Sequence, residues 1–361
     1  MIRLADIITQ HEDEFLECYG EGLLPSHRKA LSAIKTCRNT FSPKMLLECE
    51  KQQCAHREIL PHSCGHRHCP YCQNYETDKW LQSQLQKLVP GVYYLAGFTL
   101  PFEFRNMVWQ NQRLVYAMMF KNVWATLKTF CLNDRRLGGI PGGVLVLHTH
   151  SRKLDFHPHI HVIIPAASID KNKRLYKQKG RYLFNGKALA KVFRAKMLES
   201  LKESGIHLPQ SHPAKWNVQC KRVGNGQKAL KYLARYLYRG VISEKNIVSF
   251  KNGKVIFRYK NSKTKRYCFK TVSAVDFIWL IIQHVLPRGF RRVRNFGFLH
   301  PNSKSLIKII RLKFGINIMP ENTGLKPRPP KICPCCGSIM RIILTQLPAG
   351  FSLLSAIKEP L

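Results

Sequence analysis

The feature that most restricts how this chain can fold is the crowding of cysteine near its amino terminus. Seven of the 13 cysteines lie between Cys18 and Cys72, and six of them fall within the 36 residues from Cys37 to Cys72. Short Cys-x4-Cys and Cys-x2-Cys spacings joined by a loop can place four thiolates around one point, the tetrahedral arrangement of structural Zn²⁺. The simplest predicted ligand set is Cys49, Cys54, Cys69 and Cys72.

This segment holds more donors than one zinc site needs. Cys37, Cys64 or an interleaved histidine could serve a second ion, so all six cysteines are candidate ligands. We expect a closed, structural site, because nothing in the pattern marks an open fourth position. The alternative is a set of buried free thiols in a reducing cytosol.

A second cysteine group lies near the carboxyl end, after a basic, proline-rich stretch. Cys333, Cys335 and Cys336 fall within four residues, and no further cysteine lies nearby in the sequence. Two interpretations stay open. The group is either a zinc half-site completed from elsewhere in the chain or a turn with free thiols.

Charge restricts the function. Lys and Arg total 59 against 21 Asp and Glu, so the 361-residue chain carries a formal net charge of +38. Such a surface is attracted to polyanions, because each neutralised phosphate releases condensed counterions. Hydrophobic residues make up 45% of the chain, enough to bury a core. No apolar run reaches the ~18 residues of a membrane span, and Met1–Gln10 lacks a signal-peptide pattern. We therefore expect a cytoplasmic protein with no membrane partner.

The order of strand-like and helical segments indicates the fold class. Apolar strand-like runs are predicted at 93–100, 144–148, 159–164, 254–259 and 266–272. Helical periodicity is predicted over 108–132, 188–201 and 228–239. Strands that are linked by turns and kept apart from helices are typical of an α+β domain with a largely antiparallel sheet.

Three histidines stand at the start of one predicted strand, in the sequence His157-Pro-His159-Ile-His161. Side chains alternate between the faces of a strand, so His159 and His161 point the same way with Ile160 opposed. Two imidazoles about 7 Å apart at their Cα atoms can bind one divalent cation. The alternative interpretation, an ordinary hydrogen-bonded polar residue with no metal, suits one histidine on a strand better than three.

The predicted helix 228–239 carries two tyrosines on its basic side. At about 100° per residue, Tyr236 lies about 40° from Tyr232, while the leucines fall on the opposite, core-directed face. Three cations surround the phenols: Lys228, Arg235 and Arg239. Tyrosines on a core helix are usually packing residues, but nearby cations and a metal-bound phosphate favour a phenolate that attacks phosphorus.

At this point the sequence resembles the insertion-sequence ninety-one family of rolling-circle, two-tyrosine HUH transposases, over nearly its whole length. The ordered motifs carry the resemblance: Ser63-Cys-Gly-His-Arg-His-Cys-Pro-Tyr-Cys72, Phe98-Thr-Leu-Pro101, Leu147-His-Thr149, His157-Pro-His-Ile-His161, Tyr232-Leu-Ala-Arg-Tyr236 and Arg294-Asn-Phe-Gly297. It implies an HUH-nuclease-like antiparallel sheet flanked by helices, with a small amino-terminal zinc-binding domain, in a nucleoid-associated bacterial protein.

The resemblance also implies roles for individual residues. His159 and His161 would bind Mg²⁺ or Mn²⁺, and Tyr232 and Tyr236 would form 5′-phosphotyrosine links with single-stranded DNA. Relatives carry Gln where this chain has Arg152, and arginine cannot ligate a metal. The third ligand is therefore His157, Asp155, Gln227 or a water.

Three units are expected along the chain. Residues 1–88 would form a zinc-binding DNA-recognition domain, 89–300 the HUH tyrosine nuclease, and 301–361 a basic tail with the second cysteine group. Two other functions stay open: a related HUH replication initiator or relaxase, and a non-catalytic zinc-containing DNA-binding protein.

Overall fold

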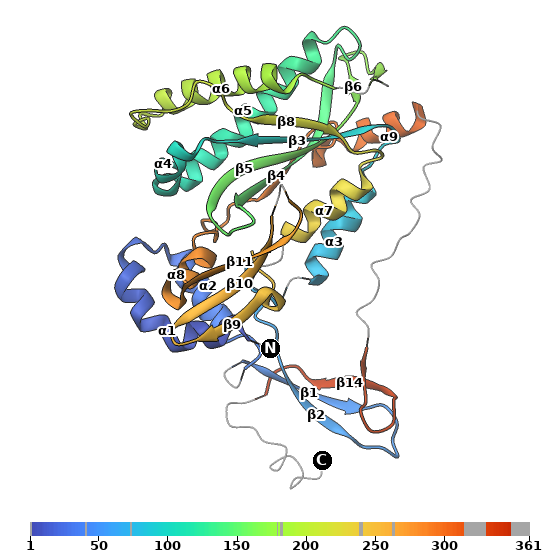
Figure 1. Cartoon of the computed structure of the whole chain (residues 1–361). Coiled ribbons are helices and arrows are strands. Elements are labelled where there is room, and N and C mark those ends of the chain that lie inside the picture. The colour runs from blue at the N-terminus through green and yellow to red at the C-terminus, as the bar shows by residue number, and fades with distance from the viewer. Residues whose placement is uncertain are drawn as a thin grey trace.

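Figure 1 shows the computed structural model of the chain. It describes residues 2–39, 42–72, 74–178, 180, 183–237, 241–261, 264–313 and 330–347, without the side chains of 74, 75 and 235–237. A seven-stranded antiparallel sheet forms the largest body, with most strands in the order β7-β6-β4-β5-β3-β8 and β12 paired to β4. These strands are β3 (Tyr93–Thr99), β4 (Ile140–His150), β5 (Phe156–Pro165), β6 (Ala167–Ile169), β7 (Leu175–Lys177), β8 (Val218–Arg222) and β12 (Val293–Gly297).

Helices cover both faces of this sheet (Figure 1). On one face, α5 (Gln112–Asn133) and α6 (Gly186–Glu203) bury residues such as Leu147, Ile160 and Val162, with α4 (Arg105–Gln110) preceding α5. On the other face, α3 (Asn74–Leu85), α7 (Gln227–Leu237) and α9 (Lys304–Lys313) enclose a smaller core that includes Val146 and Ile163. The alternation along β5 therefore directs its odd-numbered residues, histidines included, to the α3–α7 face.

A second α+β layer lies beside the sheet. The meander β9 (Ile247–Lys251), β10 (Lys254–Lys260) and β11 (Tyr267–Ser273) leads into α8 (Ala274–Ile282). The amino-terminal helices α1 (Leu4–Tyr19) and α2 (Pro25–Lys35) pack on α8, where Tyr19 stacks on Trp279 at 4.6 Å between ring centroids. The core of this layer contains residues from Leu4 to Val285, so it includes residues from both sides of the predicted boundary at 88.

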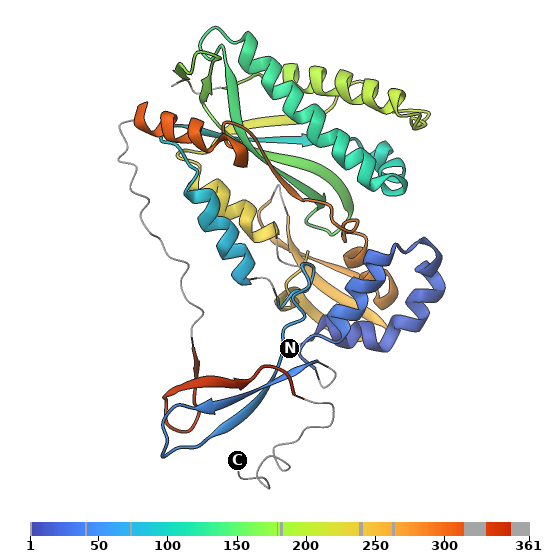
Figure 2. The same cartoon turned by 180° about the vertical axis from the view of Figure 1, so that it is seen from behind.

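A four-stranded ribbon extends away from these layers (Figure 2). Its order is β13-β14-β1-β2, so that β1 (Lys44–Cys49) and β2 (Arg57–Pro61) pair with β13 (Lys331–Ile332) and β14 (Ile339–Leu344). Four 3₁₀ turns complete the described structure: η1 (Gly20–Gly22), η2 (Phe102–Phe104), η3 (Glu244–Asn246) and η4 (Pro301–Ser303).

The predicted α+β class with an antiparallel sheet is confirmed. The three-unit division stays a prediction, although packing joins segments across its boundaries, since β14 pairs with β1. Within the described residues, no helix is both long and apolar enough to cross a membrane.

The pairing of β12 with β4 depends on a glycine. Gly297 has a φ of +60°, and a Cβ there would lie 1.7 Å from the Pro141 carbonyl oxygen. Gly205, after α6, also has a positive φ, +71°, but has nothing within 4 Å of the same position. The left-handed backbone costs an alanine about 1–2 kcal/mol at either site, but only Gly297→Ala must also displace a strand.

We therefore expect Gly297→Ala to lower the midpoint of thermal or urea unfolding far more than Gly205→Ala. Equal shifts for the two variants would contradict the close approach of β12 to β4.

Candidate active site and cysteine clusters

Three imidazoles from two neighbouring strands converge on the α3–α7 face of the sheet. His159 and His161 lie two residues apart on β5, and the register places His148 of β4 directly opposite His159. The ring centroid of His148 lies 5.3 Å from that of His159 and 4.7 Å from that of His161. One ring nitrogen from each of the three lies within 4.8 Å of the others, a spacing that suits one shared cation.

The hydrogen bonding and burial of these rings favour the neutral imidazole, the form that can bind a metal ion. The Nδ1–H of His159 donates to the His157 carbonyl oxygen at 2.7 Å, which leaves Nε2 with its lone pair. Burial lowers the pKa of His159 to about 3 and that of His161 to about 4, and it holds the pKa of His148 well below its usual range. Among the described residues, the buried Nδ1 of His161 has no hydrogen-bond partner. A divalent cation therefore fits this donor set.

The third imidazole of this cluster belongs to His148. The sequence suggested a different third ligand: His157, Asp155, Gln227 or a water. His157 lies beside His159, but its Nδ1 accepts a hydrogen bond from the Arg105 guanidinium at 3.1 Å. Asp155 accepts from Ser151 and pairs with Lys270. Arg152 donates to the Lys260 carbonyl oxygen at 3.2 Å, away from the ring cluster.

The tyrosine helix packs as its periodicity predicts. Ala229, Leu230 and Leu233 are buried against the sheet, whereas Lys228 is exposed. Tyr232 is 37% exposed, and its ring centroid lies 6.4 Å from that of His161. Tyr236 follows one turn later on α7, but its side chain, that of Arg235 and the whole of Arg239 lie outside the described residues.

The imidazoles and Tyr232 line one cavity of about 860 Å³. The sheet forms one wall, and the meander forms the other through Phe257, Arg258, Tyr259 and Lys260. Arg152 and Lys245 add two further cations, and no described lining residue is Asp or Glu. A positively charged cavity of this size can hold a nucleotide phosphate beside the phenol.

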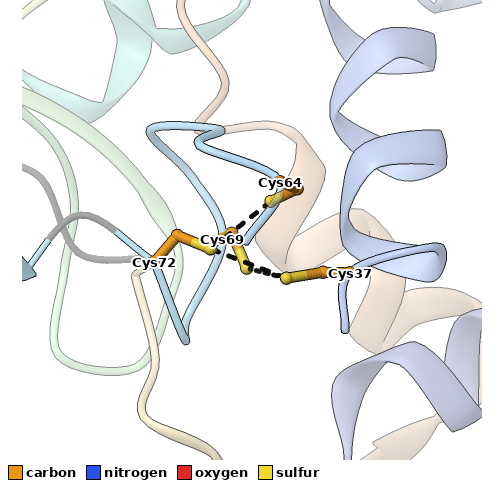
Figure 3. Close-up of side chains that lie close together, drawn as sticks. All are labelled: Cys37, Cys64, Cys69 and Cys72. Atoms are coloured by element: carbon orange, nitrogen blue, oxygen red, sulfur yellow. Dashed lines mark hydrogen bonds between the residues drawn. The ribbon is translucent and has the colours of Figure 1, made fainter. Parts of the chain in front are cut away.

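The first of two cysteine clusters joins α2 to the loop 64–72 (Figure 3). The sulfur atom of Cys37 lies 3.5 Å from those of Cys69 and Cys72, and that of Cys64 lies 3.6 Å from Cys72. All four are free thiols. Sulfurs at the corners of a tetrahedron around zinc, each about 2.3 Å from the metal, are ~3.8 Å apart. The cluster therefore fits one zinc ion.

The second cluster closes the ribbon. The sulfur of Cys49 lies 3.4 Å from that of Cys336, and the sulfur of Cys54 lies 3.8 Å from that of Cys333. These four thiols form one group, to which the exposed Cys335 does not belong. The carboxyl-terminal half-site is thus completed from elsewhere in the chain.

This arrangement corrects the predicted set of Cys49, Cys54, Cys69 and Cys72. All six predicted cysteines belong to one cluster or the other. Cys64, Cys69 and Cys72 share a loop and are completed by Cys37, whereas Cys49 and Cys54 are completed by Cys333 and Cys336. Cys49 ends β1, whose pairing with β14 brings it to Cys336. Cys69 and Cys72 instead meet Cys37, two residues after the end of α2.

The chain matches two protein-family models in the order of these sites. The model described as "Transposase zinc-binding domain" covers residues 7–100 and so includes Cys37, Cys64, Cys69 and Cys72. The model described as "Putative transposase" covers residues 142–305 and so includes His148, His159, His161 and Tyr232.

Curated relatives and solved structures were also matched. The chain is 31% identical over 321 residues to "Putative transposase y4qJ" of Sinorhizobium fredii, covering 82% of this chain and 80% of the relative. It is 28% identical over 297 residues to the transposase for insertion sequence element IS801 of Pseudomonas savastanoi pv. phaseolicola, covering 77% and 71%. A solved structure of the conjugative relaxase TrwC in complex with mutant OriT DNA matches at 13% identity with a TM-score of 0.29, covering 61% of this chain and 73% of that one. The family models and the curated relatives confirm the resemblance of the motifs: the chain belongs to the IS91 family of transposases.

Proposed function

We propose that this transposase cleaves and transfers single DNA strands through 5′-phosphotyrosine intermediates, with Tyr232 and Tyr236 as nucleophiles. The observation that carries the proposal is the meeting of three neutral imidazoles with the Tyr232 phenol at one positively charged cavity. A phenol is a weak nucleophile at its ordinary pKa of about 10. Cations at the cavity wall stabilise the phenolate and attract the phosphate.

His148, His159 and His161 would hold the catalytic Mg²⁺ or Mn²⁺. When bound, the cation polarises the scissile phosphate and offsets charge on the leaving oxygen. Three neutral ligands leave the charge of a dication uncompensated, which suits that role. Arg152, in place of a ligand, lies at the cavity wall, where its guanidinium can contact the DNA backbone.

In the proposed step, the Tyr232 oxygen attacks phosphorus, a new O–P bond forms and the bond from phosphorus to the 3′ oxygen breaks. The proton lost by the phenol is balanced by the proton gained by the 3′ oxygen, which leaves as a hydroxyl. The phosphotyrosine conserves the linkage for rejoining, which hydrolysis would not.

Tyr236 would act in the same way from one turn further along α7. Two nucleophiles allow the donor and target strands to be held together before exchange, so that an element moves as a single peeled strand in rolling-circle transposition. The cations Lys228, Arg235 and Arg239 would contact the phosphates of these strands.

Removal of the phenolic oxygens tests the nucleophiles. We expect Tyr232→Phe/Tyr236→Phe to form no covalent adduct with labelled single-stranded element ends in Mn²⁺, because the packing ring stays while the attacking atom is lost. Tyr259→Phe is the matched control, since Tyr259 lines the same cavity from β10. It should form adducts at the wild-type level in the same denaturing gel assay. An adduct on the double variant, or none on the wild type, would contradict the proposal.

The third ligand is tested by a pair of histidine variants. We expect His148→Ala to lower the rate of adduct formation about 100-fold or more, as loss of a metal-binding interaction does. His157→Ala should stay within about tenfold of wild type, because its side chain bonds to Arg105 and not to the cluster. Single-turnover rates across a Mn²⁺ titration measure both effects, and a larger loss at His157 than at His148 would reverse the assignment.

We also propose that each cysteine cluster holds one structural zinc, which gives two ions per chain. We expect Cys336→Ser to bind one zinc fewer, because it removes a ligand from the ribbon site. Cys335→Ser, a change of the adjacent exposed thiol, should keep both. Elemental analysis of the purified chains measures the stoichiometry, and the same zinc content for both variants would count against the ribbon site.

A further inference from the structure

A second cavity, of about 880 Å³, lies along β12 and shares no lining residue with the histidine cavity. Its walls are formed by the loop 64–72, by α3, by the start of α5, and by β12 with the turns that flank it. Five arginines line it, and no described lining residue is Asp or Glu: Arg67, Arg113, Arg291, Arg292 and Arg294. Aromatic rings stand among them: Trp80, Phe290, Phe296 and His300.

Contacts within the protein hold three of these arginines in place. Arg67 donates to the Phe290 carbonyl oxygen at 3.2 Å, and Arg113 donates to the Arg288 carbonyl oxygen. The guanidinium of Arg294 stacks on Phe290, 5.2 Å from the ring centroid, and also on Phe120. These contacts restrict the side chains, so a phosphate that binds them pays less of the entropy cost of ordering a flexible surface arginine.

The positive charge of this cavity, which we call the β12 groove, favours the binding of an anion. Burial, and after it the like charge of Arg291, lowers the pKa of Arg294. Like charges that converge without a carboxylate repel one another, and bound phosphates relieve that repulsion while releasing their counterions. Three residues of the motif Arg294-Asn-Phe-Gly297, which the tyrosine chemistry does not use, line this groove: Arg294, Asn295 and Phe296.

We propose that the β12 groove binds the backbone of single-stranded DNA. Single strands expose the faces of their bases, which stack on aromatic rings, whereas a duplex keeps those faces inside. This groove combines guanidinium groups with the rings of Trp80, Phe296 and His300, which suits a single strand and not a duplex.

The groove also lies next to the imidazoles. The Leu147 N–H donates to the Arg292 carbonyl oxygen at 2.9 Å, and the next residue of β4 is His148. A DNA strand held along β12 would therefore run beside β4, the β-strand that carries His148. The proposal rests on DNA as the partner of this transposase but not on the tyrosine chemistry.

The test compares two charge-matched double variants at the two ends of α5. Arg113→Gln/Arg291→Gln removes two exposed arginines from the groove. Arg135→Gln/Arg136→Gln removes two exposed arginines beyond the far end of this 22-residue helix, about 33 Å along its axis. Binding of a fluorescent oligonucleotide is followed by anisotropy at several salt concentrations, without added Mg²⁺ or Mn²⁺, so that the result is independent of strand cleavage.

We expect the groove variant to lose about tenfold in affinity for the single strand and to flatten the log–log salt slope by about 1.4, for two lost phosphate contacts. The control should change less than threefold. Arg291→Gln alone, which removes one exposed side chain, should show about half the change in slope. This single variant distinguishes the loss of a phosphate contact from misfolding of the double variant. Equal losses for groove and control variants would overturn the proposed site. An equal loss on a duplex of the same length would overturn the single-strand assignment.

Discussion

The antiparallel pairing of β4 with β5 is the constraint on which the site depends. It sets His148 opposite His159 and Val146 opposite His161, so three imidazoles reach the same face of the sheet. A slip of one residue would turn every side chain of β4 to the opposite face. The register is held by hydrophobic burial on both faces, under α5 and α6 on one and under α3 and α7 on the other. The packing of the core therefore sets the geometry of the three imidazoles.

Local periodicity was enough to predict the parts of the site that lie within one element. The alternation of β5 placed His159 and His161 on one face, and the helical period of α7 separated Tyr232 from its buried leucines. The third imidazole could not be found in this way, because it depends on which residue of β4 stands opposite His159. That pairing depends on the turn and bulge between the strands together with the packing of both faces, and no local pattern encodes it.

The cysteines show the same limit more sharply. Their number predicted zinc, but their spacing did not show which thiols meet. Cys64, Cys69 and Cys72 share one loop, whereas Cys49 and Cys336 are 287 residues apart. The ribbon that joins them forms because β14 adds to the edge of β1. Long-range strand pairing costs loop-closure entropy and yields only a small core here, with Leu47 and Met340 among its few buried residues. A metal that binds all four thiols would offset that cost.

The loop 64–72 connects the three sites of the molecule. Cys64, Cys69 and Cys72 bind it to α2 through Cys37, Pro70 lines the histidine cavity, and Arg67 lines the β12 groove. The loop has little regular structure of its own, so its position depends on the thiol cluster and on the Arg67 contact with Phe290. A zinc ion in this cluster would therefore fix one wall of each cavity proposed to bind DNA, without contacting the DNA itself. The proposed zinc would thereby account for a cysteine cluster placed against the sheet that carries the histidines, and not only in the separate ribbon.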